Sequence, residues 1–284
     1  NLPNADWIRA EYGSKSVTIS NLTHSYAMAA KGNGFKDEFI KDQEVRTLID
    51  RYGDICDDLH TDLHECLGHG SGQLLPQTDP DALKNYGNTI EEARADLFGL
   101  YYIADYKLVE LGLTPSPEAY KAQYYEYLLN GLITQLVRIK PGHTIEEAHM
   151  RNRSLIAHWV YEHSNGAIKL QKIEGKTLLY ISNYETLRSL FAQLLAEIQR
   201  IKSEGDFEAA KQLVETYAVK VDEKLHKEVL DRYKQLNIAP YKGFINPWMK
   251  LKKNEKGEII DVLIDYTESY THQMLRYSKE YATL

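Results

Sequence analysis

The sequence predicts a mostly α-helical fold with small β-hairpin elements. Apolar residues recur at helical spacing along most of the 284 residues, in segments that begin at capping residues and end at glycine or proline. Only two segments have the pattern of short strands joined by a tight turn. The regular alternation of strands and helices that builds a parallel sheet is not found in the sequence.

The clearest helical segment is TIEEARADLFGLYYIADYKLVELG. Its N-cap would be Asn88 or Thr89, and it would end at Gly112, because two prolines follow shortly afterwards. Asp206 is the expected N-cap of a later helix. The other predicted helices cover roughly residues 36–50, 55–69, 116–138, 144–163, 183–203, 206–219 and 222–236.

Two hairpins are predicted from turn signals between short apolar runs. AIKLQKIEGKTLLYI would turn at EGK, and WMKLKKNEKGEIIDVLIDY would turn at NEKG. The second hairpin and a helix after it would occupy about residues 245–284. A domain boundary near residues 164–176 is the alternative, but no linker-like composition supports it, so residues 1–284 are expected to form a single mostly helical lobe.

Composition limits the partners and the compartment. A formal net charge of −7 argues against the basic surface of a nucleic-acid-binding domain, so no nucleic-acid partner is expected. No apolar run approaches the roughly 20 residues that cross a bilayer, so no membrane association is expected. Cys56 and Cys66 are too few for a disulfide framework and are expected to be free thiols in a reducing, cytoplasmic compartment.

Residues 64–69, HECLGH, differ from the HExxH zinc motif by one inserted residue. HExxH on an α-helix places its histidines about 40° apart around the axis, whereas the insertion moves the second one to about 140°. One i→i+5 turn would realign His64 and His69. Gly68 would ease this distortion, because glycine tolerates unusual backbone angles. The alternative is a polar helix end whose histidines bind nothing.

A catalytic zinc site also needs a third protein ligand. Glu92, in the segment EEARAD of residues 91–96, would lie in the first turn of the long helix and could reach a metal held by a neighbouring helix. Glu91 and Asp96 could accept the distal N–H groups of the ligand histidines. Alternatively, Thr89 and Glu92 form a capping box, and the acidic residues only suit the helix dipole.

Together, HECLGH and EEARAD resemble the paired motifs of the dipeptidyl peptidase III family of zinc exopeptidases, HExxGH and EExxA[DE]. The segments DLHTDLHECLGHGSGQL, EEAHMRNR and IKSEGDFEAAKQLVETYA also resemble this family, in scattered blocks over most of the chain. One departure is Ala93, where many members carry cysteine at a position that is not a ligand. The resemblance implies a helical zinc-metallopeptidase lobe.

The resemblance also implies roles for the motif residues. His64, His69 and Glu92 match the ligands of one zinc ion per chain. Glu65 matches the general base that activates the zinc-bound water. Glu91 and Asp96 match acidic residues that hold the two histidines in place.

Further residues match substrate-handling positions of the family. His149, in EEAHMRNR, resembles a histidine that acts near the scissile bond, and Arg153, on the same helical face, resembles a substrate-contacting arginine. Asn21 follows the stretch YGSKSVTIS and is a candidate substrate contact. Arg232 or Lys234 could meet a substrate carboxylate; the alternative is that both are exposed charges on a helix.

Length is a larger departure from the family. Its members have two lobes with the active-site cleft between them, and this chain resembles the C-terminal, zinc-bearing lobe alone. The absent N-terminal lobe supplies a tyrosine that assists catalysis and groups that hold the free amino terminus of the peptide. The expected partners are therefore peptide substrates and the missing N-terminal lobe of the parent chain.

The implied function is a zinc-dependent exopeptidase that releases dipeptides from the N-terminus of short peptides. The lobe alone is expected to be weakly active or inactive, because half of the cleft is missing. The alternative is a non-catalytic, zinc-stabilised interaction domain, which a closed site with Cys66 in place of the water would favour. Glu65 argues for chemistry, because a structural zinc site needs no base.

Overall fold

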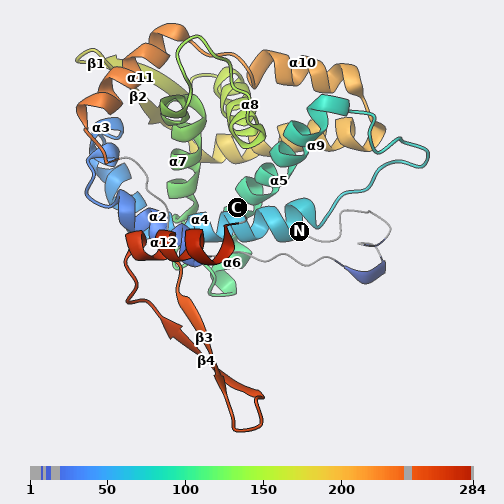
Figure 1. The fold of residues 1–284 in the computed structure, drawn as a ribbon. Coiled ribbons are helices and arrows are strands. Elements are labelled where there is room, and N and C mark those ends of the chain that lie inside the picture. Colours follow the sequence, from blue (N-terminus) through green and yellow to red (C-terminus); the bar gives the residue numbers. More distant parts are fainter. Residues whose placement is uncertain (1–7, 9–10, 14–19, 240–244, 283–284) are drawn as a thin grey trace. The chain divides into compact units, whose positions relative to one another are not determined.

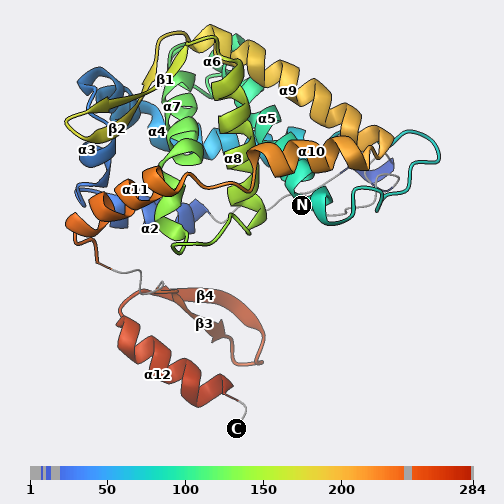
Figure 2. The ribbon, with the colours of Figure 1, turned by 90° about the horizontal axis from the view of Figure 1, so that it is seen from above.

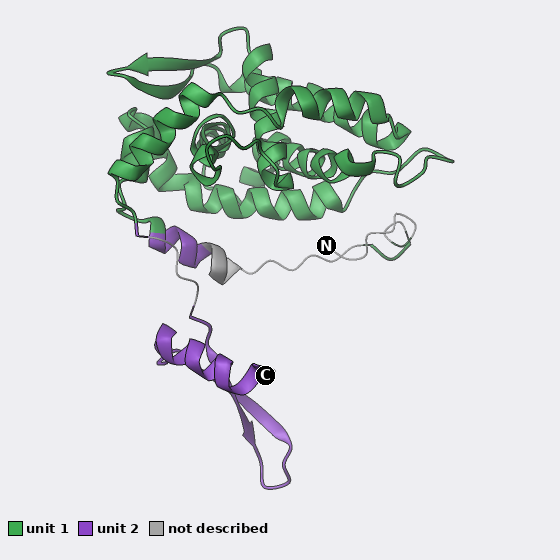
Figure 3. Ribbon diagram, turned by 45° about the horizontal axis from the view of Figure 1, so that its top comes forward, with its two compact units in different colours: residues 1–20, 30–238 green, residues 21–29, 239–284 purple. Residues whose placement is uncertain are grey.

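The structure, a computed structural model, describes residues 8, 11–13, 20–239 and 245–282. The side chains of residues 20–23 lie outside the described part. The chain groups into two compact units, one of residues 1–20 and 30–238 and one of residues 21–29 and 239–284 (Figure 3).

Helices make up most of the first unit (Figure 1), which confirms the predicted fold class. Its elements in chain order are α3 (Phe35–Phe39), α4 (Gln43–Leu63), η1 (His64–His69), η2 (Lys84–Tyr86), α5 (Gly87–Ile103), α6 (Tyr106–Glu110), α7 (Tyr120–Leu132), η3 (Thr134–Arg138), α8 (Ala148–His163), β1 (Ile168–Ile173), β2 (Lys176–Ile181), α9 (Tyr184–Glu204), α10 (Phe207–Tyr217) and α11 (Glu223–Gln235).

Helix α5 is the centre of the first unit. It packs against α4, η1, α8 and α9, while α7 and α8 run side by side (Figure 2). Its side chains Ile90, Leu97 and Leu100 have no exposed surface. A helix that is buried all round lies inside a core. The polar side chains Arg94 and Asp96 of α5 are buried as well, so they must find partners within the protein.

The helix predicted for residues 36–50 is two helices. Ile40 is extended and ends α3, and the carboxylate of Asp42 then caps α4 by accepting the N–H groups of Glu44 and Val45. From there the chain stays helical through α4 and η1 as far as His69. The sequence does not predict the break between α3 and α4, because the residues in this short stretch do not interrupt the helical spacing of the apolar residues.

The first predicted hairpin is confirmed. Strands β1 and β2 pair antiparallel with Ile173 opposite Lys176, which leaves Glu174 and Gly175 as a two-residue loop. Both loop residues have positive φ, 51° and 80°. Two such residues form the tight turn whose twist matches that of paired strands.

The second unit contains the other predicted hairpin and the C-terminal helix. Strands β3 (Trp248–Lys253) and β4 (Ile259–Asp265) pair antiparallel, and α12 (Tyr270–Tyr281) follows them. Most of α2 (Ser20–Ala30) also belongs to this unit. Gln273 of α12 has no exposed surface. Its side chain accepts from the N–H of Asn246 at 2.9 Å and donates to the carbonyl of Asn246 at 2.6 Å.

The interpretation of Arg232 as a substrate contact is wrong. Arg232 is only 4% exposed. Its Nε donates to Oε1 of Glu38 at 2.8 Å and its Nη1 donates to the carbonyl of Thr177 at 2.9 Å. The guanidinium therefore ties α11 to α3 and β2, where a substrate has no access.

Both cysteines are free thiols, as predicted: Cys56 is buried and Cys66 is exposed. Within the described ranges, no helix is both long enough and apolar enough to cross a bilayer.

Candidate metal centre

The chain forms a π-helical turn at HECLGH. The segment His64–His69 is the π-helix η1, in which the N–H of Gly70 donates to the carbonyl of Glu65, five residues earlier, at 3.1 Å. The predicted i→i+5 turn is therefore confirmed. It brings the rings of His64 and His69 to a centroid distance of 4.7 Å at 85° to each other.

Gly68 is needed here for its size. Its φ is not among the positive values found in this chain, so the expected role of unusual backbone angles is wrong. A Cβ atom at Gly68 would instead lie 2.6 Å from Cα and 2.7 Å from Cβ of Ala95 in α5. Only glycine lets η1 approach α5 this closely, and this approach carries the two histidines to the acidic side chains of α5.

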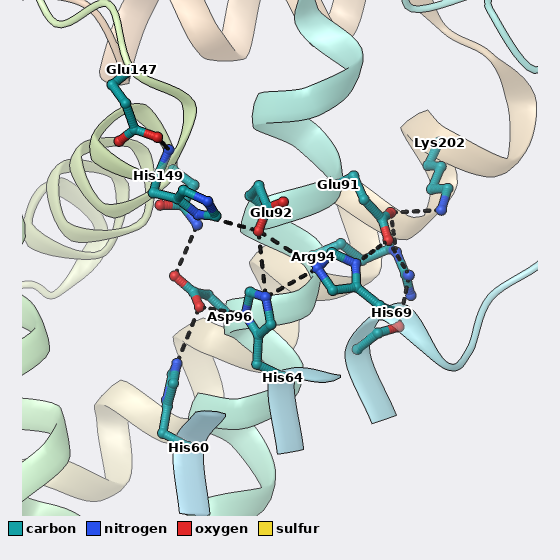
Figure 4. Close-up of polar contacts among 12 residues, drawn as sticks. His60, His64, His69, Glu91, Glu92, Arg94, Asp96, Glu147, His149 and Lys202 are labelled. Atoms are coloured by element: carbon teal, nitrogen blue, oxygen red, sulfur yellow. Dashed lines mark hydrogen bonds and ion pairs between the residues drawn. The ribbon is translucent and has the colours of Figure 1, made fainter. Parts of the chain in front are cut away.

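Three possible ligand atoms converge at this contact (Figure 4). The Nε2 atoms of His64 and His69 lie 3.0 Å apart, and Oε2 of Glu92 lies 3.4 Å from the first and 3.6 Å from the second. One ligand atom from each residue falls within a set no more than 4.8 Å across, a spacing that could hold a metal ion.

A carboxylate holds the far nitrogen of each imidazole. Nδ1 of His64 lies 2.7 Å from Oδ1 of Asp96, and Nδ1 of His69 lies 2.8 Å from Oε1 of Glu91. An ionised carboxylate can only accept, so each Nδ1 carries the proton and donates it. In the neutral imidazoles both Nε2 atoms then offer lone pairs toward Glu92, the state in which a metal is bound.

A cation fits the donor set. Oε2 of Glu92 is buried and has no hydrogen-bond donor within the described part of the chain. When both imidazoles are neutral, their two lone pairs and a carboxylate oxygen face one another, which is electrostatically unfavourable unless a cation lies between them. Two imidazoles and one carboxylate are a known zinc donor set that leaves a position open for water.

The charges around the histidines shift their pKa values strongly. Burial disfavours the charged imidazolium of His64, but the carboxylates of Asp96 and Glu92 outweigh burial and raise the pKa of His64 to about 10. The carboxylates of Glu91, which accepts from Nδ1 of His69, and of Glu92 raise the pKa of His69 to about 9. A metal ion must therefore displace protons from this site at neutral pH.

The carboxylate of Glu92 stays ionised. Burial alone would raise the pKa of Glu92, but the imidazoles of His64 and His69 and the charge of His149 lower it below its ordinary value. The anion is therefore available to a metal over the whole physiological pH range.

Asp96 collects four donors. Its Oδ1 accepts from His64 and, at 3.2 Å, from Nε2 of His60, whereas its Oδ2 accepts from the hydroxyl of Tyr127 at 2.7 Å and from Nδ2 of Asn152 at 2.9 Å. Burial would raise the pKa of Asp96, but the two histidines hold it well below its ordinary value. Asp96 is thus a buried anion stabilised mainly by hydrogen bonds.

Glu91 has a different environment, because two cations hold it. Arg94, which has no exposed surface, donates from Nε and Nη2 to Glu91 at 3.0 and 2.9 Å, and Nζ of Lys202 lies 2.6 Å from its Oε2. Nη2 of Arg94 also donates to the carbonyl of Gly68 at 2.8 Å. Arg94 therefore connects the EEARAD segment to the π-helical turn.

His60, Arg94, Tyr127, Asn152 and Lys202 were missed at the sequence level. His60 lies one helical turn before His64, and Arg94 lies inside EEARAD, so both had a local signal. Tyr127 and Asn152 had none, because they lie 31 and 56 residues from Asp96. Only tertiary packing brings them to the site.

The remaining predicted site residues lie on η1, α8 and α2. Glu65 follows His64 on η1 and is partly buried. Nδ1 of His149, at the start of α8, lies 3.4 Å from Oε2 of Glu92, with the His149 side chain 55% exposed. Arg153 lies one turn further along α8 and is partly buried. Asn21 belongs to α2, but its side chain lies outside the described residues.

The capping-box alternative for Glu92 is wrong. Helix α5 begins at Gly87, its N-cap is Tyr86, and no side chain caps it. Thr89 is therefore inside the helix rather than at its N-cap, and Glu92 lies in the second turn. Glu92 is consequently not engaged in capping, and its carboxylate points to the histidines instead (Figure 4).

Comparison with known proteins agrees with this geometry, which has the donor set of a metallopeptidase. The family model described as peptidase family M49 matches residues 1–88 and 80–272. The chain belongs to peptidase family M49. The family resemblance inferred from HECLGH and EEARAD is thereby confirmed.

Curated relatives with similar sequences are dipeptidyl peptidases 3. The mouse protein, from Mus musculus, is 26% identical over 264 residues, and the human protein, from Homo sapiens, is 24% identical over 264 residues. The match to each covers 78% of this chain and 35% of the relative. The chain thus spans about a third of the length of these relatives.

Solved structures share the fold. The structure of DPP III from Caldithrix abyssi is 26% identical, with a TM-score of 0.62 over 84% of this chain and 42% of that one. The structure of dipeptidyl-peptidase III from Corallococcus sp. strain EGB gives a TM-score of 0.65 at 21% identity, over 84% of this chain and 41% of that one.

Proposed function

We propose that this chain carries the metal centre of a zinc-dependent exopeptidase that releases dipeptides from the N-terminus of short peptides. The observation that supports it best is the convergence of His64, His69 and Glu92 within 4.8 Å, with an oriented Nδ1–H on each imidazole. The relatives named dipeptidyl peptidase 3 supply the substrate class.

His64, His69 and Glu92 would hold one zinc ion per chain. A zinc ion with this donor set supplies Lewis-acid chemistry, lowering the pKa of a bound water to about 7 and polarising the substrate carbonyl. The set has three protein ligands, and the exposed Cys66 is not among them. This favours a catalytic site with an open position over a closed structural site.

Glu65 would be the general base. It directly follows His64 on the π-helical turn and is partly buried. Its carboxylate would take a proton from the attacking water and pass that proton to the nitrogen of the leaving amine. Glu91 and Asp96 would keep the two ligand imidazoles oriented meanwhile.

His149 and Arg153 would handle the substrate. His149 is half exposed and adjoins Glu92, so it could donate a hydrogen bond to the oxygen that becomes negative as water attacks. One such donor contributes about 3 kcal/mol to transition-state stabilisation. Arg153 would bind a peptide carbonyl or carboxylate, and Asn21 is a further candidate contact.

The missing part of the parent chain would complete the cleft. The relatives are about three times as long as the matched region, and a dipeptide cut requires groups that hold the free amino terminus two residues from the scissile bond. Large apolar side chains are exposed on both strands of the hairpin in the second unit, including Met249, Leu251 and Leu263. They support contact of residues 1–284 with the rest of the parent chain. The free thiols support a cytoplasmic location.

The test compares the longer parent protein with the 284-residue chain. Each is incubated with an unblocked peptide and with the same peptide acetylated at its N-terminus, and products are identified by mass spectrometry. The proposal expects dipeptides from the unblocked peptide only, fast for the parent and slow or absent for the shorter chain. Internal cleavage of both peptides would make the protein an endopeptidase instead.

A further inference from the structure

Besides His64 of η1, donors from three further helices surround the Asp96 carboxylate. His60 comes from α4, Tyr127 from α7 and Asn152 from α8, and all three are at most 6% exposed. Among the described residues, Oδ1 accepts from the two histidines His60 and His64, whereas Oδ2 accepts from Tyr127 and Asn152 alone. The two oxygens therefore have separate partners.

Small residues bring these helices together. A Cβ atom at Gly99 of α5 would lie 3.0 Å from the carbonyl of His60, and one at Gly131 of α7 would lie 2.5 Å from the carbonyl of Arg153, next to Asn152. The close approach of α4 to α5 and of α7 to α8 therefore depends on missing side chains. Both of these close helix contacts lie within about one helical turn of a residue that donates to Asp96.

Two of the side chains that donate to Asp96 also carry a second polar atom that has no hydrogen-bond partner among the described residues. Oδ1 of Asn152 and Nδ1 of His60 are buried and have no hydrogen-bond partner among the described residues. A buried polar atom without a partner lowers stability. Asn152 is therefore buried with its Oδ1 unpaired while its Nδ2 donates to Oδ2 of Asp96 at 2.9 Å.

We propose that Tyr127 and Asn152 are positioning residues of the metal centre, which hold Oδ2 of Asp96 so that Oδ1 stays aimed at Nδ1 of His64. The inference rests on the proposed metal site. A carboxylate held at one oxygen cannot rotate about its bond to the chain. It therefore fixes both the tautomer and the ring orientation of the ligand histidine.

The first test is Tyr127→Phe in the full 284-residue chain, with zinc affinity measured by competition with a chromophoric chelator. The matched control is Tyr124→Phe. Tyr124 is also a buried tyrosine of α7, and its hydroxyl also donates to α5, at 2.8 Å to the carbonyl of Leu100. Tyr127→Phe should weaken zinc binding about 10-fold. Tyr124→Phe should change zinc affinity less than about 2-fold. This difference in zinc affinity should remain even if the two variants unfold at the same temperature.

A second pair keeps the test decisive if Tyr127→Phe does not fold. Asn152→Ala removes the other donor to Oδ2. Its control, Ser154→Ala, deletes a buried hydrogen bond from the same helix, 2.8 Å to the carbonyl of Tyr217. Asn152→Ala should weaken zinc binding about 10-fold and Ser154→Ala should not.

A double substitution separates positioning from general packing. If Tyr127 acts through Asp96, Tyr127→Phe should weaken zinc binding less than about 2-fold in the Asp96→Asn background. Equal losses for Tyr127→Phe and Tyr124→Phe, or a full 10-fold loss in both backgrounds, would overturn the inference. If the unsubstituted chain bound no zinc, that result would contradict the proposed metal site itself and could be told apart from failure of the positioning role.

Discussion

The Nε2 atoms of His64 and His69 lie 3.0 Å apart although the residues are five positions apart in the sequence. On a regular α-helix the two side chains would diverge by about 140°. The π-helical turn removes this divergence, and Glu92 of the next long helix then lies within 3.6 Å of both nitrogens. The inserted residue in HECLGH thus accompanies a change of helix type that leaves the two imidazoles close enough to share one metal ion.

The role of Glu65 is tested by Glu65→Gln in the longer parent protein. Glutamine has nearly the same shape but cannot accept the proton of the attacking water. Turnover of an unblocked peptide should fall by about 10²–10⁴-fold while zinc content stays the same. Turnover within 2-fold of the original would assign the base to another residue.

The close contact of η1 with α5 is tested by Gly68→Ala. The added Cβ would lie 2.6 Å from Cα of Ala95, so the turn must move away from α5 and carry His69 with it. We expect a loss of about 1–3 kcal/mol in the free energy of unfolding, measured by urea denaturation, together with weaker zinc binding.

Gly87→Ala is the control for this substitution. A Cβ at Gly87, the first residue of α5, would lie 3.7 Å from its nearest neighbour, the Cβ of Leu83, which is an ordinary contact. It should leave both stability and zinc affinity nearly unchanged. If Gly68→Ala behaved like Gly87→Ala, the tight packing of η1 on α5 would have no bearing on the site.

Glu126 of α7 predicts a pH dependence of stability. Burial, and with it the negative charges of Asp57, Asp54 and Asp50, raises the pKa of Glu126 to about 7. The folded protein therefore keeps a proton that the unfolded chain releases near pH 4.5, its ordinary pKa. The contribution of Glu126 to the free energy of unfolding is therefore fully present below pH 4.5 and is lost as the pH rises through about 7.

Glu126→Gln, which cannot ionise, measures this effect. The variant should gain roughly 1–3 kcal/mol of unfolding free energy over the original protein at pH 8 and little at pH 4. Denaturant titrations at both pH values supply the comparison, and Glu110→Gln on the exposed surface of α6 is the control. A gain of equal size at both pH values would show that ionisation of Glu126 is not the cause.

Local signals predicted much of this structure. The turn at Glu174 and Gly175, the cap at Asp206, which accepts the N–H of Ala209 at 3.1 Å, and the π-helical turn all follow from residues that are near in sequence. The start of α5 was misplaced, because Asn88 and Thr89 are good capping residues on their own. Packing overrides that preference by continuing the helix from η2 into α5.

The support of the site could not be predicted locally. Tyr127 and Asn152 lie on helices that the sequence identifies, but nothing in their neighbourhood indicates that they face Asp96. Arg232 shows the converse case: an arginine that suggested an exposed charge is buried against Glu38, 194 residues away. Long-range polar contacts of this kind depend on how the helices pack.

The metal assignment is tested most directly by zinc content, measured by elemental analysis after dialysis, for the 284-residue chain and for Glu92→Ala. We predict one zinc ion per chain in the first. Glu92→Ala should hold much less than one, because two neutral imidazoles alone bind the ion weakly. Zinc content near zero in the unsubstituted chain, or near one in both, would contradict the assignment of His64, His69 and Glu92 as the metal ligands.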